Sequence, residues 1–170
     1  MRGLEPVRRL DRRILMAMRQ RAHGPAADRA VRAYSELGEH SRLWLVLAGT
    51  GAIADRERRP TYLRAVKGLV AAELVTAAMK RAVRRRRPRI DGLPHLMRTP
   101  SGLSYPSAHA STSFAAARVL SAALPTGPLY LAATLMACSR PYLGVHYPSD
   151  VVAGAALGVG LAELVGRSPS

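Results

Sequence analysis

Residues 139–150 read SRPYLGVHYPSD and join two apolar, Ala-rich segments of the chain. The turn-forming Pro and Gly residues of this stretch separate the charged and polar groups that it carries. Pro148 suits the first turn of a new helix, where its missing N–H costs nothing. His146 is then expected at the start of that helix, with Asp150 one turn further on. The stretch therefore predicts two helices joined by a polar connection.

The same stretch combines a cation, an imidazole and a carboxylate. A carboxylate one helical turn from an imidazole can hold the ring by one nitrogen and leave the other nitrogen free to attack. The planar guanidinium of Arg140 can bind a phosphate nearby. A polar loop between two helices remains the alternative on this stretch alone, so the choice depends on partners elsewhere in the chain.

The composition favours one all-α domain covering residues 1–170, long enough to bury a sizeable core. Hydrophobic residues make up 48% of the chain and aromatic residues only 5%, so its apolar content is mostly small and aliphatic. The formal net charge of +15 requires an anionic partner: nucleic acid, an anionic membrane surface or a phosphorylated substrate. Scarce aromatics argue against single-stranded nucleic acid. The one cysteine, Cys138, is expected to be a small core filler.

Residues 1–38 are expected to form one or two amphipathic helices ahead of the core. Residues 8–21 combine apolar positions at helical spacing with many arginines, which suits either an interfacial helix on anionic lipid or a solvated face of a soluble bundle. A second short helix is expected at 26–37. The first ten residues contain no apolar run long enough for a signal peptide.

Five segments are candidates for membrane helices, although no uninterrupted apolar run reaches the ~18 residues that would mark a spanning helix outright. They cover residues 41–57, 62–83, 107–123, 127–140 and 149–166. A tight turn is expected at 125–128. Charge bias places the Arg-dense N-terminus and the 81–100 and 140–148 loops on one side, predicted to be cytoplasmic. The arginines of the short 56–61 loop weaken this orientation.

Two more segments carry groups suited to phosphate. Arg87 precedes Pro88, which ends a helix and stiffens the chain after this guanidinium. The rest of the 84–87 arginine run is interpreted as a solubilising or lipid-headgroup patch. Ser107 and His109 open a further helix, whose N-terminus offers free N–H groups and partial positive charge. A histidine near a helix start is, by itself, more often a capping or core residue.

Together the three segments resemble the tripartite signature of the phosphatidic acid phosphatase type 2 superfamily, which also includes bacterial acid phosphatases and vanadium haloperoxidases. The matching residues are Lys80, six residues, Arg87-Pro88; then Pro106-Ser107-Ala108-His109; then Ser139-Arg140, five residues, His146, three residues, Asp150. The resemblance covers residues 40–166 and implies a helical membrane bundle, with six membrane helices in typical lipid-acting members. Here Ala108 replaces the usual Gly, and the missing first membrane helix favours five.

The resemblance also implies a role for each residue. His146 would attack phosphorus and form a phosphohistidine with Asp150 orienting it, and His109 would protonate the leaving alcohol and then activate water. The remaining site residues would bind the substrate phosphate: Lys80, Arg87, Ser107, Ala108 and Arg140. We expect no cofactor and no metal, because cations and donors already surround the phosphate and no metal-ligand spacing is present.

We therefore expect a metal-independent phosphomonoesterase in the plasma membrane, acting on a polyprenyl-linked or glycerolipid phosphate. A short, Arg-rich member with a cytoplasmic site resembles the decaprenylphosphoryl-5-phosphoribose phosphatase branch; phosphatidate, phosphatidylglycerophosphate and polyprenyl pyrophosphate stay open as substrates. A soluble acid phosphatase or haloperoxidase is a second enzyme hypothesis. The non-enzyme hypothesis is a basic membrane-surface or nucleic-acid-binding protein, whereas the phosphatase hypothesis involves membrane lipids and no nucleic acid.

Two points stay open. Glu73 and Arg118 lie within apolar helices and could be paired, line the substrate site or reach the membrane surface. Gly154 and Gly158 form a small-residue face that could serve an internal or an intersubunit contact, so the oligomeric state is not predicted.

Overall fold

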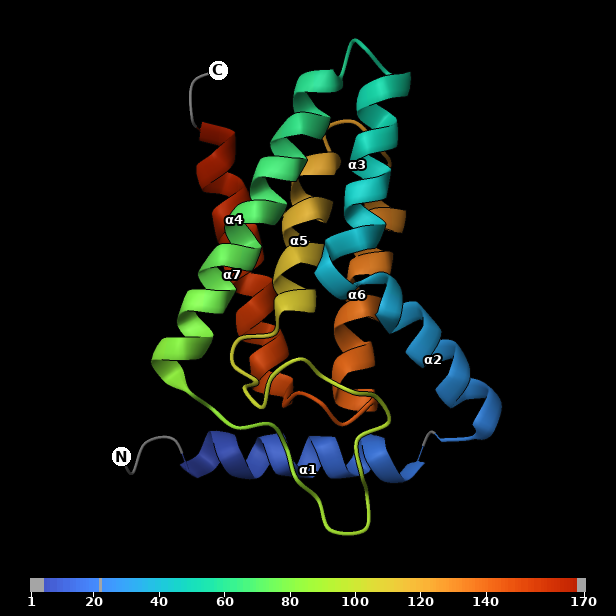
Figure 1. Ribbon diagram of the computed structural model, residues 1–170, viewed down its shortest axis with the longest axis vertical. Coiled ribbons are helices and arrows are strands. Elements are labelled where there is room, and N and C mark those ends of the chain that lie inside the picture. The colour runs from blue at the N-terminus through green and yellow to red at the C-terminus, as the bar shows by residue number, and fades with distance from the viewer. Residues whose placement is uncertain (1–4, 22, 168–170) are drawn as a thin grey trace.

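The computed structural model describes residues 5–21 and 23–167, and it is all-helical over them (Figure 1). The helices are α1 (Glu5–Arg21), α2 (Pro25–Leu37), the 3-10 turn η2 (Glu39–Ser41), α3 (Arg42–Ala54), α4 (Arg59–Val83), α5 (Ala108–Leu120), α6 (Thr126–Tyr142) and α7 (Pro148–Arg167). Over the described residues, the β-type pairing is one isolated bridge, between Arg86 and Leu103. The prediction of an all-helical fold is confirmed.

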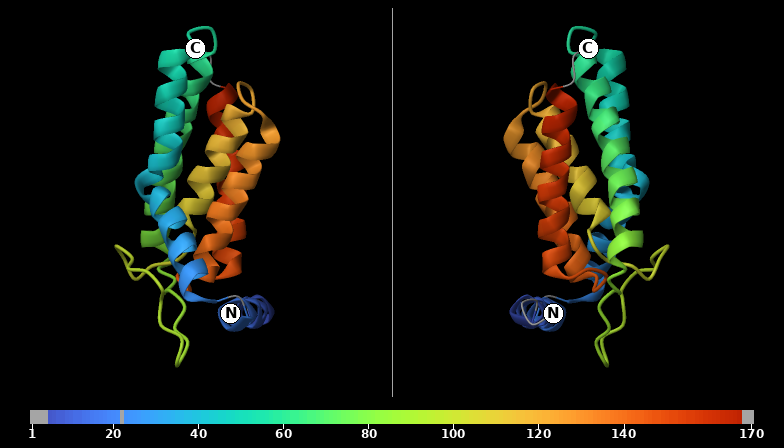
Figure 2. Two further views of the ribbon diagram at one scale, coloured as in Figure 1. Left: turned by 90° about the vertical axis from the view of Figure 1, so that its right-hand side faces the viewer. Right: turned by 90° about the vertical axis from the view of Figure 1, so that its left-hand side faces the viewer.

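Helices α3 to α7 stand side by side as a bundle, and α1 lies across one end of it (Figures 1 and 2). Helix α2 rises from that end and leads through η2 into α3. The long connection between α4 and α5, residues 84–107, and the short connection between α6 and α7 lie at the same end. That end of the bundle therefore gathers α1 and the two connections that carry the motif residues.

Helix α5 forms the centre of the bundle and packs against α4, α6 and α7. Most of its buried side chains are Ala, Ser or Thr, so the neighbouring backbones approach closely. A Cβ added to Gly154 of α7 would lie 2.4 Å from the Ser107 carbonyl oxygen. A Cβ added to Gly158 would lie 2.1 Å from the Ser111 carbonyl oxygen. The small-residue face of α7 therefore makes an internal contact with α5.

The outer faces of the bundle expose large apolar side chains: Val46, Ile53, Leu74, Leu131, Val152 and Leu164. In the part of the chain that the structure describes, one helical stretch is long and apolar enough to cross a membrane on length and composition, Pro148–Gly166, with a mean hydropathy of 1.4. It corresponds to the segment predicted at 149–166. The count of five membrane helices stays a prediction.

Some local predictions differ from the structure. The tight turn expected at 125–128 is wrong, because α6 already begins at Thr126 and the turn lies at 121–125. Pro128 falls in the first helical turn, where a missing N–H is tolerated. The core position expected for Cys138 is also wrong: it lies exposed on α6, where it lines an apolar groove with Tyr34 and Leu135.

The two charged residues inside apolar helices are both paired. The Glu73 carboxylate accepts a hydrogen bond from the Ser41 hydroxyl at 2.9 Å. Arg118 Nε donates to Glu163 Oε1 at 2.6 Å, joining α5 to α7. Both side chains of the second pair are more than two-fifths exposed. Pairing, one of the three alternatives that the sequence leaves open, is what the structure shows.

Candidate active site

The three motifs meet at the end of the bundle that α1 crosses. Lys80 lies in the last turn of α4, and Arg87 follows in the connection after it. Ser107 and His109 lie at the start of α5, Arg140 in the last turn of α6, and His146 and Asp150 on either side of the start of α7. All except Lys80 and Ala108 are buried. The fold thus brings together residues from four helices and two connections.

His146 lies between a guanidinium and a carboxylate. Its Nε2 is 3.1 Å from Arg87 Nη1, and its Nδ1 is 3.6 Å from Asp150 Oδ2. Because a guanidinium only donates, Nε2 acts as the acceptor and the proton of the neutral ring is on Nδ1, facing Asp150. Arg87 is fixed in turn by the carbonyl oxygens of Val145 and Ser101, each at 2.8 Å. This geometry leaves the lone pair of Nε2 directed toward the cationic side of the site.

The charges around His146 keep its ring neutral. Burial lowers its pKa well below 6.5, and the positive charges of Arg140, Arg87 and Lys80 lower it further. Burial also lowers the pKa of Arg87 to about 10, against the opposing effect of Asp150 and Glu39. Arg87 therefore stays charged near neutral pH, while His146 keeps the unprotonated nitrogen that a nucleophile requires.

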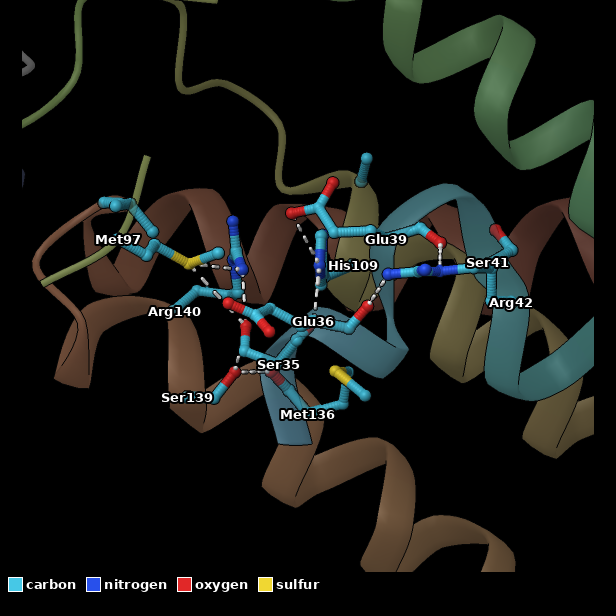
Figure 3. Close-up of polar contacts among 12 residues, drawn as sticks. Ser35, Glu36, Glu39, Ser41, Arg42, Met97, His109, Met136, Ser139 and Arg140 are labelled. Atoms are coloured by element: carbon cyan, nitrogen blue, oxygen red, sulfur yellow. Dashed lines mark hydrogen bonds and ion pairs between the residues drawn. The ribbon is translucent and has the colours of Figure 1, made fainter. Parts of the chain in front are cut away.

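Arg140 and His109 share one partner from α2 (Figure 3). Arg140 Nη1 donates to the Ser35 hydroxyl, and His109 Nε2 donates to the Ser35 carbonyl oxygen at 3.2 Å. Glu39 approaches His109 Nε2 at 3.6 Å. The buried Nε of Arg140 has no hydrogen-bond partner among the described residues. A buried guanidinium N–H with no protein partner is well suited to bind an anion.

The start of α5 is a capped helix N-terminus that lies among the other motif residues. Ser107 is the N-cap, and its hydroxyl accepts from the Ala110 N–H at 3.4 Å. Its own N–H donates to the Asp150 carbonyl oxygen at 2.9 Å, so this N–H is not available to phosphate. Ala108 begins the helix and has no positive φ, so alanine adopts this position without needing the backbone freedom of glycine.

The arginine run does not behave as one patch. After the left-handed C-cap at Arg84, residues 85–87 follow in a nearly extended conformation that pairs Arg86 with Leu103. Alternate side chains of an extended segment point to opposite sides, so Arg85 and Arg87 turn inward while Arg84 and Arg86 are exposed. Arg85 Nη1 donates to Asp150 Oδ1 at 2.7 Å. The interpretation of Arg85 as part of a solubilising or lipid-headgroup patch is therefore wrong, because its guanidinium is paired with Asp150.

Sequence reasoning missed four residues outside the predicted site that touch motif residues or their direct partners. They are Asp11 of α1, Ser35 of α2, Glu39 of η2 and Arg85 of the connection after α4. One signal for Asp11 is present in the sequence. It shares a helical face with Leu15 and Arg19, at spacings of four and eight residues, and these three are the buried residues of α1. A carboxylate on the inward face of a basic helix indicates a buried partner.

Residues 61–169 match the family model of the PAP2 superfamily. The chain belongs to the PAP2 superfamily. It is 42% identical over 141 residues to the decaprenylphosphoryl-5-phosphoribose phosphatase of Mycobacterium tuberculosis, covering 83% of this chain and 80% of that protein. The enzyme of the same name from Mycolicibacterium smegmatis is 40% identical over 142 residues, covering 83% of this chain and 79% of that protein.

Two crystal structures have the same fold. LpxE of Aquifex aeolicus superposes with a TM-score of 0.80 at 24% identity, covering 94% of this chain and 96% of that one. The transmembrane PAP2 type phosphatidylglycerolphosphate phosphatase of Bacillus subtilis superposes with a TM-score of 0.79 at 26% identity, covering 96% of this chain and 86% of that one. The predictions of family and enzyme class are confirmed: the chain is a membrane-associated lipid phosphate phosphatase, a hydrolase of phosphoric monoesters.

Proposed function

We propose that this phosphatase removes the 5-phosphate of decaprenylphosphoryl-5-phosphoribose at the cytoplasmic face of the plasma membrane. The observation that carries the proposal is the 40–42% identity to two phosphatases named for this substrate, over about four-fifths of each chain. Phosphatidylglycerophosphate and polyprenyl pyrophosphate are the alternative substrates.

The proposed reaction has two steps. His146 Nε2 attacks phosphorus, the bond from phosphorus to the ribose oxygen breaks, and His109 protonates that oxygen as the alcohol leaves. His109 then takes a proton from water, whose oxygen attacks the phosphohistidine and releases inorganic phosphate. Asp150 faces the Nδ1 proton of His146 and would stabilise the positive charge that the ring gains. Neither step requires a metal or a cofactor.

In this mechanism the phosphoryl oxygens are bound by the positive charges of Lys80, Arg87 and Arg140. The Ser107 hydroxyl and the N–H groups of the first turn of α5, beginning at Ala108, would add neutral donors. The three cations lie close enough to depress the pKa of His146 together, which supports their action on one phosphate.

A cationic cavity beside the site supports a substrate with two phosphates. A cavity of about 470 Å³ is lined by Arg84, Arg86, Arg87 and Arg89, of which Arg87 also contacts His146. The substrate named above carries a phosphodiester to decaprenol in addition to its phosphomonoester. Four guanidiniums are more than one phosphomonoester needs, and the second phosphate would neutralise part of their charge.

A membrane bundle of five helices, α3 to α7, would place this chemistry at the lipid surface. The exposed apolar side chains on the outer faces support it, because a protein in water rarely presents so many. At ~1.5 Å per residue α3 and α5 reach only about 20 Å, short of a ~30 Å hydrocarbon core, and α5 is enclosed by its neighbours. The basic α1 would lie on the cytoplasmic surface, with residues 1–170 forming one domain around the core at 40–166.

The test is phosphate release by the purified full chain in detergent with EDTA. Synthetic decaprenylphosphoryl-5-phosphoribose, phosphatidate, phosphatidylglycerophosphate and polyprenyl pyrophosphate are compared at equal concentration. We expect release from the first at the highest kcat/KM and loss of turnover in His146→Ala. A matched control is His40→Asn, because Asn tolerates the left-handed backbone of His40 (φ 51). Preference for another lipid would refute the substrate, and undiminished turnover by His146→Ala would refute the mechanism.

A further inference from the structure

A carboxylate on α1 reaches the catalytic end of the bundle from outside the three motifs. Asp11 is only 2% exposed although its helix is strongly basic. Its Oδ1 accepts from the Ser149 N–H at 2.8 Å, and its Oδ2 accepts from the Ser149 hydroxyl at 2.6 Å. Oδ2 also accepts from Arg85 Nη2 at 2.7 Å. Asp11 thus binds both the start of α7 and the connection after α4.

Arg85 carries this contact on to the residues beside the nucleophile. Its Nη1 donates to Asp150 Oδ1 at 2.7 Å, and its guanidinium lies 4.1 Å from the centre of the Tyr147 ring. The other oxygen of Asp150 accepts from the Tyr147 N–H at 2.9 Å and faces His146 Nδ1. Charged hydrogen bonds therefore run from Asp11 through Arg85 to Asp150, whose second carboxylate oxygen lies 3.6 Å from Nδ1 of the neutral His146 ring.

Helix α1 is held against the site at a second point, two turns further along. Arg19 Nη1 donates to the Tyr142 carbonyl oxygen at 3.2 Å, and Nη2 donates to the Pro94 carbonyl oxygen at 2.6 Å. A Cβ on Gly144 would lie 3.2 Å from Arg19 Nε, so the side chain rests on the connection that carries His146. With α1 fixed at these two points, Asp11 has a defined position relative to His146.

The charges explain what Asp11 does for Asp150. Burial lowers the pKa of Arg85, but hydrogen bonds and charge interactions with Asp11 and Asp150 outweigh it and raise that pKa, so Arg85 stays charged. With two carboxylates on one guanidinium, Arg85 neutralises only part of the Asp150 charge. Without Asp11, the full positive charge of Arg85 would act on Asp150, and less negative charge would remain to stabilise His146 as it becomes positive during attack.

We propose that Asp11 is a positioning residue for the nucleophile, held in place by Ser149, acting through Arg85 on Asp150 and touching neither substrate nor phosphate. The inference rests on the proposed function, because it requires His146 to attack phosphorus. Replacing Asp11 should slow the chemical step and leave substrate binding unchanged.

The experiment measures kcat and KM of the full chain in detergent for Asp11→Asn, Arg85→Gln and the double variant, on the lipid that wild type hydrolyses. We expect Asp11→Asn to lose about tenfold in kcat at unchanged KM, the lower end of the losses seen when outer hydrogen-bond partners of metal-bound histidines are replaced. The double variant should be no slower than Arg85→Gln, since Asp11 acts through that residue. Glu5→Gln is the control, as Glu5 is an exposed carboxylate of the same helix.

A second readout separates positioning from general damage. Orthovanadate adopts the five-coordinate geometry of phosphorus under attack, so its affinity depends on the position and orientation of the His146 ring. The affinity for inorganic phosphate depends only on the cations of the site. Calorimetry should show orthovanadate about tenfold weaker in Asp11→Asn and inorganic phosphate unchanged. Equal losses for both anions, or multiplying losses in the double variant, would overturn the inference.

Failure of the two proposals can be told apart. A wild type that binds both anions but hydrolyses none of the four lipids contradicts the proposed function. An active wild type with Asp11→Asn indistinguishable from Glu5→Gln contradicts this inference alone. If Asp11→Asn does not fold, Ser149→Ala is the smaller change: it removes the hydroxyl that donates to Asp11 Oδ2 and accepts from Arg85 Nη1, and keeps the N–H that binds Asp11 Oδ1. It should show a smaller loss of orthovanadate affinity in the same direction. An orthovanadate affinity of Ser149→Ala equal to that of wild type would also overturn the inference.

Discussion

Gly158→Ala should damage both the stability and the activity of this phosphatase, because no room exists for a methyl group at that position. The added Cβ would lie 2.1 Å from the Ser111 carbonyl oxygen and 3.0 Å from the Ala115 nitrogen, and both atoms belong to the backbone of α5. A flexible side chain could turn away, but a helix backbone enclosed by its neighbours cannot. The two helices must therefore move apart.

The magnitude follows from two opposing effects. Overpacking of a tight contact costs about 1–3 kcal/mol, whereas Ala in place of Gly within a helix contributes up to about 1 kcal/mol of stability. Gly160→Ala, two residues away, isolates the second effect, because a Cβ there meets nothing within 4 Å. The free energies of unfolding of the two variants should differ by the overpacking cost. For a chain of this size that difference corresponds to about 2–12 °C in Tm.

Thermal unfolding in detergent of wild type, Gly158→Ala and Gly160→Ala measures this difference. We also expect a lower kcat in Gly158→Ala alone, since the separated helices carry the Ser107 N–H and the Asp150 carbonyl oxygen that pair at 2.9 Å. Equal melting temperatures for the two alanine variants would refute the reasoning, because they would show that α5 and α7 do not approach as closely as the structure has them.

Three further predictions concern single side chains. The folded state keeps the pKa of His146 well below 6.5, whereas the unfolded chain has the ordinary value. The free energy of unfolding should therefore fall as the pH drops below about 6.5. Chemical denaturation at about pH 7.5 and 5.5 should show a smaller fall in His146→Gln than in wild type. Ser35→Ala removes the hydroxyl that binds Arg140 and should lower kcat/KM about tenfold in phosphate-release assays. Arg118→Ala should change the free energy of unfolding by no more than about 1 kcal/mol, because its pair with Glu163 is largely exposed.

Much of the fold follows from local signals. The Ala-rich composition and the Pro and Gly breaks predict helices at nearly their observed places, and α7 begins at Pro148 as the sequence indicates. Motif spacing also identifies the residues that the fold gathers, since His146 and Asp150 are one turn apart and need no long-range information. Ser35 could not be found in this way. Its partners Arg140 and His109 are 105 and 74 residues distant, and only the packing of α2 beside α6 brings them together.

The arginine run shows most clearly where a linear pattern loses information. A run of four arginines predicts one continuous basic surface. In the structure Arg85 pairs with two carboxylates and Arg87 contacts His146, whereas Arg84 and Arg86 line a cavity. The division arises because the helix ends at Arg84, whose φ of 53 turns the chain into an extended segment held by residues 102–104. In a continued helix, Arg85 and Arg87 would point about 200° apart around the axis; in an extended segment they share one side. The end of α4 therefore decides which arginines contact Asp150 and His146 and which line the cavity beside them.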